Sequence, residues 1–146
     1  FDLTAGFCKD AYSIANMGFQ VTAYEKESWL FEFNKTCLSS LKKSNLNLIN
    51  LNSIRILKKV TKKDILFLDP MFEISSRASA KKEIQFLRKC IPTSSEKEIL
   101  DAAQKSSAGV IIIKRHKMSK SLTPTKPSYV IKGKVISFEV FDRRAV

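Results

Sequence analysis

Short apolar runs alternate with amphipathic stretches along most of this chain, and this alternation constrains the fold more than any other feature. Five runs are predicted as strands: residues 1–4 (the end of a first strand), 19–24, 46–51, 65–68 and 110–113. Apolar residues at helical spacing lie between them, around residues 11–18, 29–41, 54–57, 84–91 and 96–105. Strands that alternate with helices form a parallel sheet covered by helices on both faces. The sequence therefore predicts one α/β domain.

Two features refine this prediction. The run from Ile65 to Leu68 is apolar throughout, which predicts a central strand buried on both faces and ended by Asp69-Pro70. The last 20 residues break the alternation, because residues 128–132 and 135–141 are separated only by Gly133 and its flanking lysines. This spacing predicts an antiparallel hairpin at the end of the sheet. The polar segment 114–126 is the longest predicted loop.

The domain spans residues 1–146, and we find neither an internal repeat nor a second domain. Phe1 falls inside the first strand, which the fold predicts to be central. We therefore expect the domain to lack an N-terminal region that precedes this strand.

Charge indicates the class of partner. The chain has 26 Lys and Arg against 14 Asp and Glu, a formal net charge of +12, which favours a polyanion such as RNA. No apolar stretch approaches the roughly 18 to 20 residues that cross a bilayer, so we expect no membrane span. Cys8, Cys37 and Cys90 cannot all pair and match no metal-binding spacing, which predicts no metal and a reducing compartment, the cytoplasm.

The turn after the first strand is where an α/β sheet of this kind binds its ligand, and it reads Asp2-Leu3-Thr4-Ala5-Gly6-Phe7-Cys8-Lys9-Asp10. Gly6 is its only glycine, whereas a dinucleotide-binding turn needs three, and no Gly-Lys-Ser/Thr for a triphosphate is present. Asp2 ends the first strand, and Glu25 ends the next, 19 residues beyond Gly6. An acid at that place can accept both hydroxyls of a ribose. This turn suits S-adenosylmethionine, which has a ribose but no phosphate; the alternative is that both acids are solvated strand ends.

Asp69-Pro70-Met71-Phe72 follows the buried strand directly, so these residues belong at the same edge of the sheet as Gly6 and Glu25. An exocyclic base amine that attacks a methyl group needs acceptors for its two hydrogens, and the Asp69 carboxylate and the Pro70 carbonyl can supply them. Phe72 can stack on a flipped base for about 1 to 3 kcal/mol. The alternative for an isolated Asp-Pro is a turn that ends the strand.

The tetrad is similar to the Asp/Asn-Pro-Pro-Tyr/Phe motif of amino-group N-methyltransferases, and its Met form resembles that of the small-subunit ribosomal RNA (guanine-N2)-methyltransferase J family. Further stretches match this family in order and span nearly the whole chain: Asp2-Leu3-Thr4-Ala5-Gly6, Lys9-Asp10-Ala11, Glu25-Lys26, Ser79-Ala80-Lys81-Lys82-Glu83, Val110 to Arg115 and Val130-Ile131-Lys132-Gly133. The resemblance implies the Rossmann-like sheet of class I methyltransferases, with helices on both faces and a C-terminal antiparallel hairpin.

The resemblance also implies transfer of a methyl group from S-adenosylmethionine to a guanine N2 amine of small-subunit ribosomal RNA, bare or in the small ribosomal subunit. The implied catalytic residues are Asp69, Pro70, Met71 and Phe72. The implied cofactor ligands are Lys9, Asp10, Glu25, Lys26, Asn52, Ser53 and Asp69. Asp2 and Gly6 of the first turn complete the predicted set. Adenine N6 or cytosine N4 of another nucleic acid is an alternative target, and a non-catalytic RNA-binding domain is an alternative of another class.

Four residues depart from the family pattern. Cys8 stands where Gly is usual, and its side chain would crowd the methionine end of the cofactor. Lys9 replaces an Arg, which keeps the charge but loses the bidentate fork. Glu73 and His116 each replace a Pro.

Basic residues follow the tetrad and the fifth strand, and together they can hold RNA phosphates around the target base. They are Arg77, Lys81, Lys82, Lys114, Arg115, Lys117 and Lys120. The alternative for any one of them is an ordinary solvated lysine or arginine. His116 is predicted as a loop residue rather than a general base. Trp29 and Phe33 are predicted as core residues; the alternative for Trp29, four residues after Glu25, is a place beside the adenine of the cofactor.

Overall fold

The structure is a computed structural model that describes residues 1–41, 43–70 and 94–144. The helices are α1 (Lys9–Asn16), α2 (Ser28–Ser39), the 3-10 helix η1 (Ser53–Lys59) and α4 (Ser94–Lys105). The strands are β1 (Val21–Glu25), β2 (Leu46–Asn50), β3 (Ile65–Leu68), β4 (Val110–His116), β5 (Tyr129–Lys132) and β6 (Ile136–Asp142). The helix predicted around residues 84–91 lies outside the described residues.

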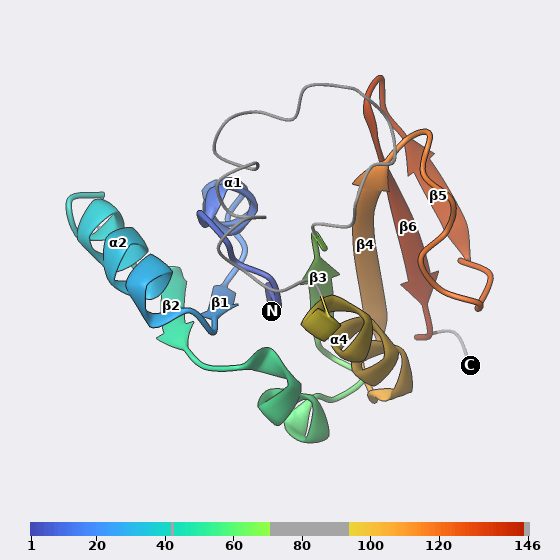
Figure 1. Cartoon of the computed structure of the whole chain (residues 1–146), viewed down its shortest axis with the longest axis horizontal. Helices are drawn as coiled ribbons and strands as arrows, with labels where there is room; N and C mark the ends of the chain where they lie inside the picture. Colours follow the sequence, from blue (N-terminus) through green and yellow to red (C-terminus); the bar gives the residue numbers. More distant parts are fainter. Residues whose placement is uncertain (42, 71–93, 145–146) are drawn as a thin grey trace.

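The first residues of the chain join two groups of strands into one sheet. Asp2 bridges Ala23 of β1 and Phe67 of β3, both in parallel, so the order is β2-β1-(residues 1–5)-β3-β4-β6-β5. β1 and β2 run parallel, as do β3 and β4, whereas β6 is antiparallel to both β4 and β5. The predicted parallel sheet, its central first strand and its C-terminal hairpin are thus confirmed (Figure 1).

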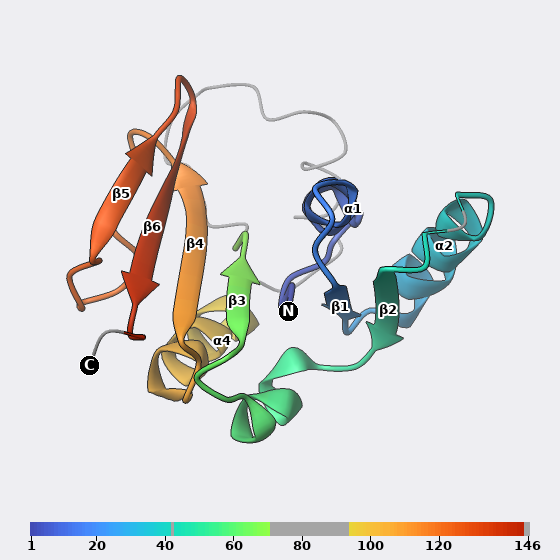
Figure 2. The same ribbon diagram turned by 180° about the vertical axis from the view of Figure 1, so that it is seen from behind.

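Helices cover both faces of the sheet because strand side chains alternate between the faces. On one face, α1 packs its Ala11 and Ala15 against Val21 and Ala23 of β1. On the other, a larger apolar cluster forms below η1 and α4 and takes in the following residues: Leu57, Leu66, Leu68, Ile99, Leu100, Ile111, Ile113 and Phe141. Accordingly, α4 lies in front of β3 and β4 in Figure 1 and behind them in Figure 2.

The prediction that Trp29 and Phe33 are core residues is wrong. Their side chains are 44% and 51% exposed, and α2 buries Leu30 and Asn34 instead. In the described part of the chain, α2 packs mainly against β1 and the edge strand β2, so a narrow stripe of the helix suffices to contact the sheet. Phe33 contacts the ring of Phe7 edge-on, with 5.9 Å between centroids.

β4 is longer than predicted and contains the first basic residues of the expected loop. Lys114, Arg115 and His116 pair with residues of β6, which reaches beyond the end of β3. The loop therefore begins only after His116, and the alternation of the strand sends Lys114 and Arg115 to opposite faces. Ile65 of β3 is 40% exposed, so burial on both faces begins only at Leu66.

Candidate functional site

Parallel strands bring their carboxyl ends to one edge of the sheet. Several residues predicted to bind the cofactor or the target base lie at this edge. Asp2 and Thr4 come from the first strand, Glu25 ends β1 and Asp69 follows β3. A hydrogen bond ties the first and third of these elements together at this edge, because the backbone N–H of Asp69 donates to the Thr4 hydroxyl at 2.7 Å. The sequence did not single out Thr4, whose partner is 65 residues away along the chain.

The turn after the first strand needs left-handed backbone at two positions. Gly6 has φ 51° and Cys8 has φ 56°. For a residue other than glycine, such as Cys8, this conformation costs about 1 to 2 kcal/mol. The Cys8 side chain is only 2% exposed and packs with Ala11 and Ala15 under α1, so the structure does not support the expected crowding of a cofactor. Burial raises the pKa of the Cys8 thiol to about 12, which keeps it protonated.

Two asparagines that the sequence reading missed hold this edge in place. The buried Asn34 of α2 donates to the Gly6 carbonyl at 2.6 Å and so fixes the turn. Asn50, the last residue of β2, donates to the Glu25 carbonyl at 2.8 Å and to the Lys26 carbonyl at 3.3 Å. Nothing in the local sequence indicates these roles, because each depends on a residue more than 20 positions away.

Glu25 is buried at the end of β1, beside the Gly6 turn. Its Oε1 accepts the backbone N–H of Glu27 at 2.8 Å. Burial raises the pKa of this carboxyl group, and the backbone N–H groups of Glu27 and Gly6 partly oppose that rise. The backbone thus orients the carboxylate where the ribose ligand was predicted.

Four more predicted cofactor ligands, which lie on α1, on η1 or just after β1 or β2, have structural contacts of their own. Asn52 caps η1, with its Oδ1 accepting the Ile54 N–H at 3.1 Å. The buried Ser53 donates to the Leu3 carbonyl at 2.8 Å and so anchors η1 to the first strand. Lys9 lies 5.9 Å from the centroid of the Phe7 ring, and Lys26 pairs with a neighbouring glutamate at 3.8 Å. Their contacts with a cofactor remain predictions.

Asp69 belongs to a cluster of charged groups that come from four elements. Lys114 of β4 donates to Oδ2 of Asp69 at 2.8 Å and to Oδ2 of Asp10, in the first turn of α1, at 2.7 Å. Asp2 lies on the same side, and burial raises its pKa to about 7, with the nearby carboxylates of Asp10 and Asp69 adding to the rise. Burial also raises the pKa of Asp69, although Lys114 opposes the rise. Three carboxyl groups and one ammonium make this cluster acidic.

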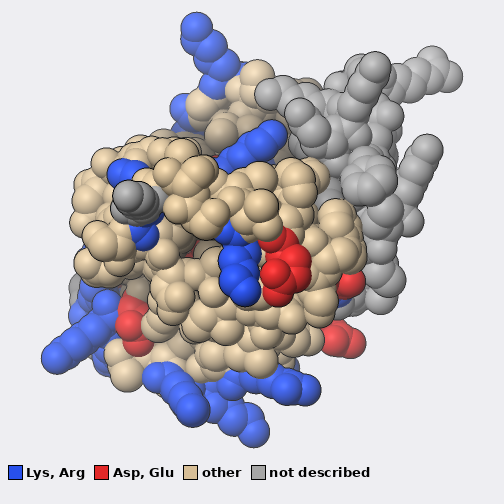
Figure 3. All heavy atoms as spheres, turned by 90° about the vertical axis from the view of Figure 1, so that its left-hand side faces the viewer, with Lys and Arg blue, Asp and Glu red and all other residues tan. Residues whose placement is uncertain are grey.

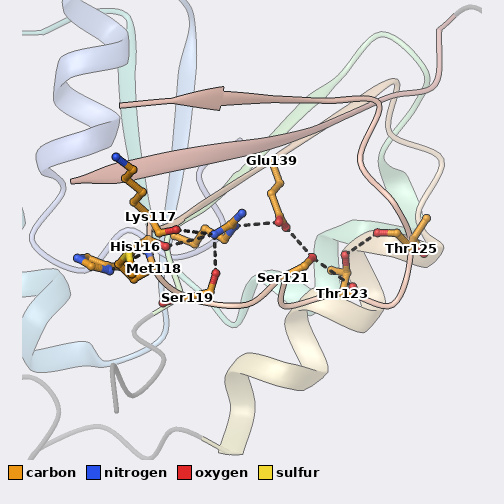
Figure 4. A network of polar contacts seen from close by, with 9 residues as sticks. His116, Lys117, Met118, Ser119, Ser121, Thr123, Thr125 and Glu139 are labelled. Carbon is orange, nitrogen blue, oxygen red and sulfur yellow. Dashed lines mark hydrogen bonds and ion pairs between the residues drawn. The ribbon is translucent and has the colours of Figure 1, made fainter. Parts of the chain in front are cut away.

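Arg115 points to the opposite face of the sheet from Lys114 and takes part in a different network. Its Nε donates to Oε1 of the buried Glu139 at 2.8 Å, and its Nη1 donates to the Ser119 carbonyl at 2.6 Å. Ser121 donates to the second oxygen of Glu139 at 3.0 Å. Figure 4 shows how these contacts shape the loop that follows β4.

Two of the predicted RNA ligands form ion pairs within the chain, and their contacts with RNA stay predictions. Lys114 lies in the acidic cluster, and the Arg115 side chain is only 14% exposed because it pairs with Glu139. Lys117 and Lys120 are exposed on the loop and stay predicted RNA contacts. His116 ends β4 instead of lying in a loop, and its Nδ1 accepts the Met118 N–H at 3.2 Å. Met71, Phe72, Arg77, Lys81 and Lys82 lie outside the described residues, whereas Pro70 is described and buried.

Among residues 1–41, 43–70 and 94–144, no group of three or more His, Cys, Asp or Glu side chains could hold a metal ion. A search of the same residues finds no helix that is long and apolar enough to cross a membrane.

Curated relatives of this chain include proteins from two bacteria that carry the same name. The ribosomal RNA small subunit methyltransferase J of Coxiella burnetii is 29% identical over 149 residues, which cover 96% of this chain and 59% of the relative. The protein of the same name from Alcanivorax borkumensis is 30% identical over 147 residues, with the same coverage of 96% and 59%. This chain therefore spans about three fifths of the length of these relatives.

Solved structures share the fold. A SAM-dependent methyltransferase from Neisseria gonorrhoeae superposes with a TM-score of 0.71 at 23% identity, covering 99% of this chain and 61% of the other. One from Agrobacterium tumefaciens gives a TM-score of 0.55 at 13% identity, with 97% and 55% covered. The model of the SAM-dependent methyltransferase family, where SAM is S-adenosylmethionine, matches residues 1–143. The match covers nearly the whole chain, and the shared fold agrees with it: this chain belongs to the SAM-dependent methyltransferase family.

Proposed function

We propose that this chain transfers a methyl group from S-adenosylmethionine to the exocyclic N2 amine of a guanine in small-subunit ribosomal RNA. The observation that carries the proposal is the position of Asp69, which the Thr4 hydroxyl and the Lys114 ammonium hold beside the Gly6 turn. An acceptor for a base amine thereby adjoins the predicted cofactor edge. The name of the relatives supports the ribosomal substrate.

The residues present fit this cofactor by the chemistry of their side chains. The oriented Glu25 carboxylate is an acceptor suited to ribose hydroxyls, which are donors. The acidic cluster of Asp2, Asp10 and Asp69 favours a positively charged ligand, and the sulfonium and ammonium of S-adenosylmethionine outweigh its one carboxylate, so that its net charge is positive. Among the described residues, an added Cβ at Gly6 would meet only the Thr4 carbonyl, at 3.9 Å, so the described part of the chain leaves this backbone open to a ligand.

When bound, the cofactor supplies an electrophilic methyl group: the amine lone pair forms the new N–C bond, and the C–S electron pair stays on sulfur. The amine nitrogen becomes positively charged and then loses one proton to solvent. Asp69 accepts an amine hydrogen and stabilises this positive charge, and the Pro70 carbonyl accepts the second hydrogen. Holding the amine in line with the methyl group supplies most of the rate enhancement.

The RNA contacts in this proposal come from exposed basic residues near the same edge. Lys117 and Lys120 extend from the loop after β4, directly beyond the strand that carries Lys114. With a net charge of +12, the chain attracts polyanions at long range. A substrate in the ribosome would place the protein in the cytoplasm, in agreement with the free thiols of Cys8 and Cys37.

The test is methylation with isotopically labelled S-adenosylmethionine of small-subunit ribosomal RNA transcribed in vitro and of small subunits assembled from it. Nucleoside analysis after digestion then identifies the base and the atom. We expect N2-methylguanosine from the wild-type chain and at least about a hundredfold less from Asp69→Ala, given the usual cost of removing a transition-state acceptor.

Label on adenine N6 or cytosine N4 would replace the guanine proposal with another amino-methyltransferase activity. Binding of RNA and cofactor without any transfer would favour the non-catalytic alternative. Glu25→Ala separates cofactor binding from chemistry, because it should weaken S-adenosylmethionine binding in calorimetry by about 1.5 to 3 kcal/mol.

A further inference from the structure

We infer that Lys114 is a positioning residue that keeps the Asp69 carboxylate ionised and oriented for the target amine. The inference deepens the proposed function and rests on it for the identity of that amine. It assigns Lys114 to the reaction site, although sequence reasoning had placed it among the RNA ligands.

The geometry gives Asp69 two separate restraints. The Thr4 hydroxyl accepts its backbone N–H at 2.7 Å and fixes the main chain where β3 ends. The Lys114 ammonium donates to its Oδ2 at 2.8 Å and fixes the side chain. In the proposal the other oxygen, Oδ1, accepts the amine hydrogen. Because both the main chain and the side chain of Asp69 are held, its carboxylate loses little further freedom when the substrate binds. Pre-organisation of this kind lowers the barrier to reaction.

Lys114 also sets the charge of the cluster. Its ammonium donates to Asp10 as well, at 2.7 Å, so it joins the first turn of α1 to the residue after β3. Without it, the carboxylates of Asp10 and Asp69 would face one another uncompensated, with Asp2 on the same side. Two close carboxylates cannot both ionise easily, and a protonated Asp69 is a poorer acceptor and no longer stabilises the charge on nitrogen.

The charged and titratable groups that face Asp69 from the described elements are Lys114 of β4, Asp10 of α1 and Asp2 of the first strand. Substitutions at two of these residues should shift the pKa of Asp69 in opposite directions. Replacing Lys114 by Met removes the cation and should raise the pKa of Asp69. Replacing Asp10 by Asn removes a competing carboxylate and should lower it.

The first measurement follows the Asp69 carboxyl carbon by NMR from pH 4 to 9, with the signal assigned by its loss in Asp69→Asn. We expect Lys114→Met to raise the titration midpoint by about 1 to 3 pH units and Asp10→Asn to lower it. Lys114→Arg keeps the positive charge and should titrate close to wild type. Lys63→Met is the matched control, because Lys63 is an exposed lysine in the loop before β3, at the opposite edge of the sheet.

The second measurement is the pH profile of turnover on the RNA identified above. The acid limb of kcat/KM, which reports groups of the free enzyme, should move to higher pH in Lys114→Met by about the same amount as the NMR midpoint of the free protein, with most activity recovered at high pH. The KM for RNA should change less than kcat at neutral pH. Lys114→Arg, which tests the charge if Lys114→Met does not fold, should leave the acid limb in place.

An Asp69 midpoint that is the same in wild type and Lys114→Met would overturn the inference. So would a loss of activity that is uniform across pH, or a loss that appears only as a higher KM for RNA, since the latter would make Lys114 an RNA ligand. If the wild-type chain methylates no RNA, the proposed function fails, and the NMR midpoints still decide whether Lys114 controls Asp69.

Discussion

At the scale of single residues, burial of acids is the feature that most distinguishes this site from an ordinary surface. Asp2, Glu25 and Asp69 all have raised pKa values, and for each the largest cause is the loss of water around the carboxylate. Such groups destabilise the folded protein when they ionise. Three such carboxyl groups at one edge of the sheet are typical of a site that binds a cationic ligand.

The titration of Asp2 allows this cost in folding stability to be measured. Its pKa is raised to about 7 in the folded chain, against 3.8 for the ordinary carboxyl group. Between these two values the folded state binds more protons than the unfolded state, so stability falls as pH rises from about 4 to 7. Asp2→Asn should remove this contribution, on the order of a few kcal/mol, and retain the Oδ1 acceptor for the Thr4 N–H.

The measurement is urea unfolding of both proteins at pH 5 and pH 8. The advantage of the variant should be larger at pH 8. An equal difference at the two pH values would mean that Asp2 titrates normally in the folded chain.

At the scale of secondary structure, the sequence predicted elements well where local pattern decides and poorly where a distant partner decides. The helix that stops before Gly18 and the hairpin around Gly133 are local features, and both are confirmed. The extension of β4 through His116 was missed because it depends on pairing with β6, at least 20 residues later. The buried face of α2 was missed because it depends on how much of the sheet the helix covers.

The same limit applies to the site. Glu25 and Asp69 could be placed because each ends a recognisable strand, and strand ends share one edge. The roles of Thr4, Asn34 and Lys114 could not, since each is defined by a contact across at least 28 residues. The chemistry of an acceptor is thus visible in a motif, whereas the groups that orient it become visible only in three dimensions.

The pair of Arg115 and Glu139 gives a prediction about the loop after β4. The side chains are 14% and 2% exposed, so removing one partner leaves a buried charge uncompensated. Arg115→Met should cost about 3 to 5 kcal/mol in the free energy of unfolding, and Glu139→Leu a similar amount. The double variant should cost much less than the two together, because two apolar side chains can pack where the charges were.

Urea unfolding of the four proteins at neutral pH gives the coupling energy. Ser121→Ala is the control, since it removes only one hydrogen bond to Glu139 and should cost about 0.5 to 1.5 kcal/mol. Additive effects of Arg115→Met and Glu139→Leu would show that the pair is not coupled in the folded chain.

At the scale of the whole molecule, the fold separates two kinds of charge. Acids gather in the cluster of Asp2, Asp10 and Asp69 at the carboxyl edge, whereas exposed Lys and Arg side chains are spread over the surface. Figure 3, seen from the α2 side, shows basic side chains standing out around the border of that face and few acidic ones. An acidic cluster within a basic surface suits a cationic cofactor and a polyanionic substrate together.

This separation of charge predicts how salt concentration affects RNA binding. RNA affinity should fall linearly in log–log form with salt concentration, with a slope of about −0.7 per phosphate contact on single strands. The double variant Lys117→Gln and Lys120→Gln should weaken binding and reduce the slope by about 1.4. Lys58→Gln with Lys59→Gln is the matched control, because both lysines are exposed at the end of η1, which leads away from the candidate site.

Fluorescence anisotropy with a labelled single-stranded fragment of small-subunit ribosomal RNA, at 50 to 300 mM salt, measures both slopes. If the η1 pair changes the slope as much as the loop pair does, RNA binds through general charge and the loop after β4 has no particular part in holding it.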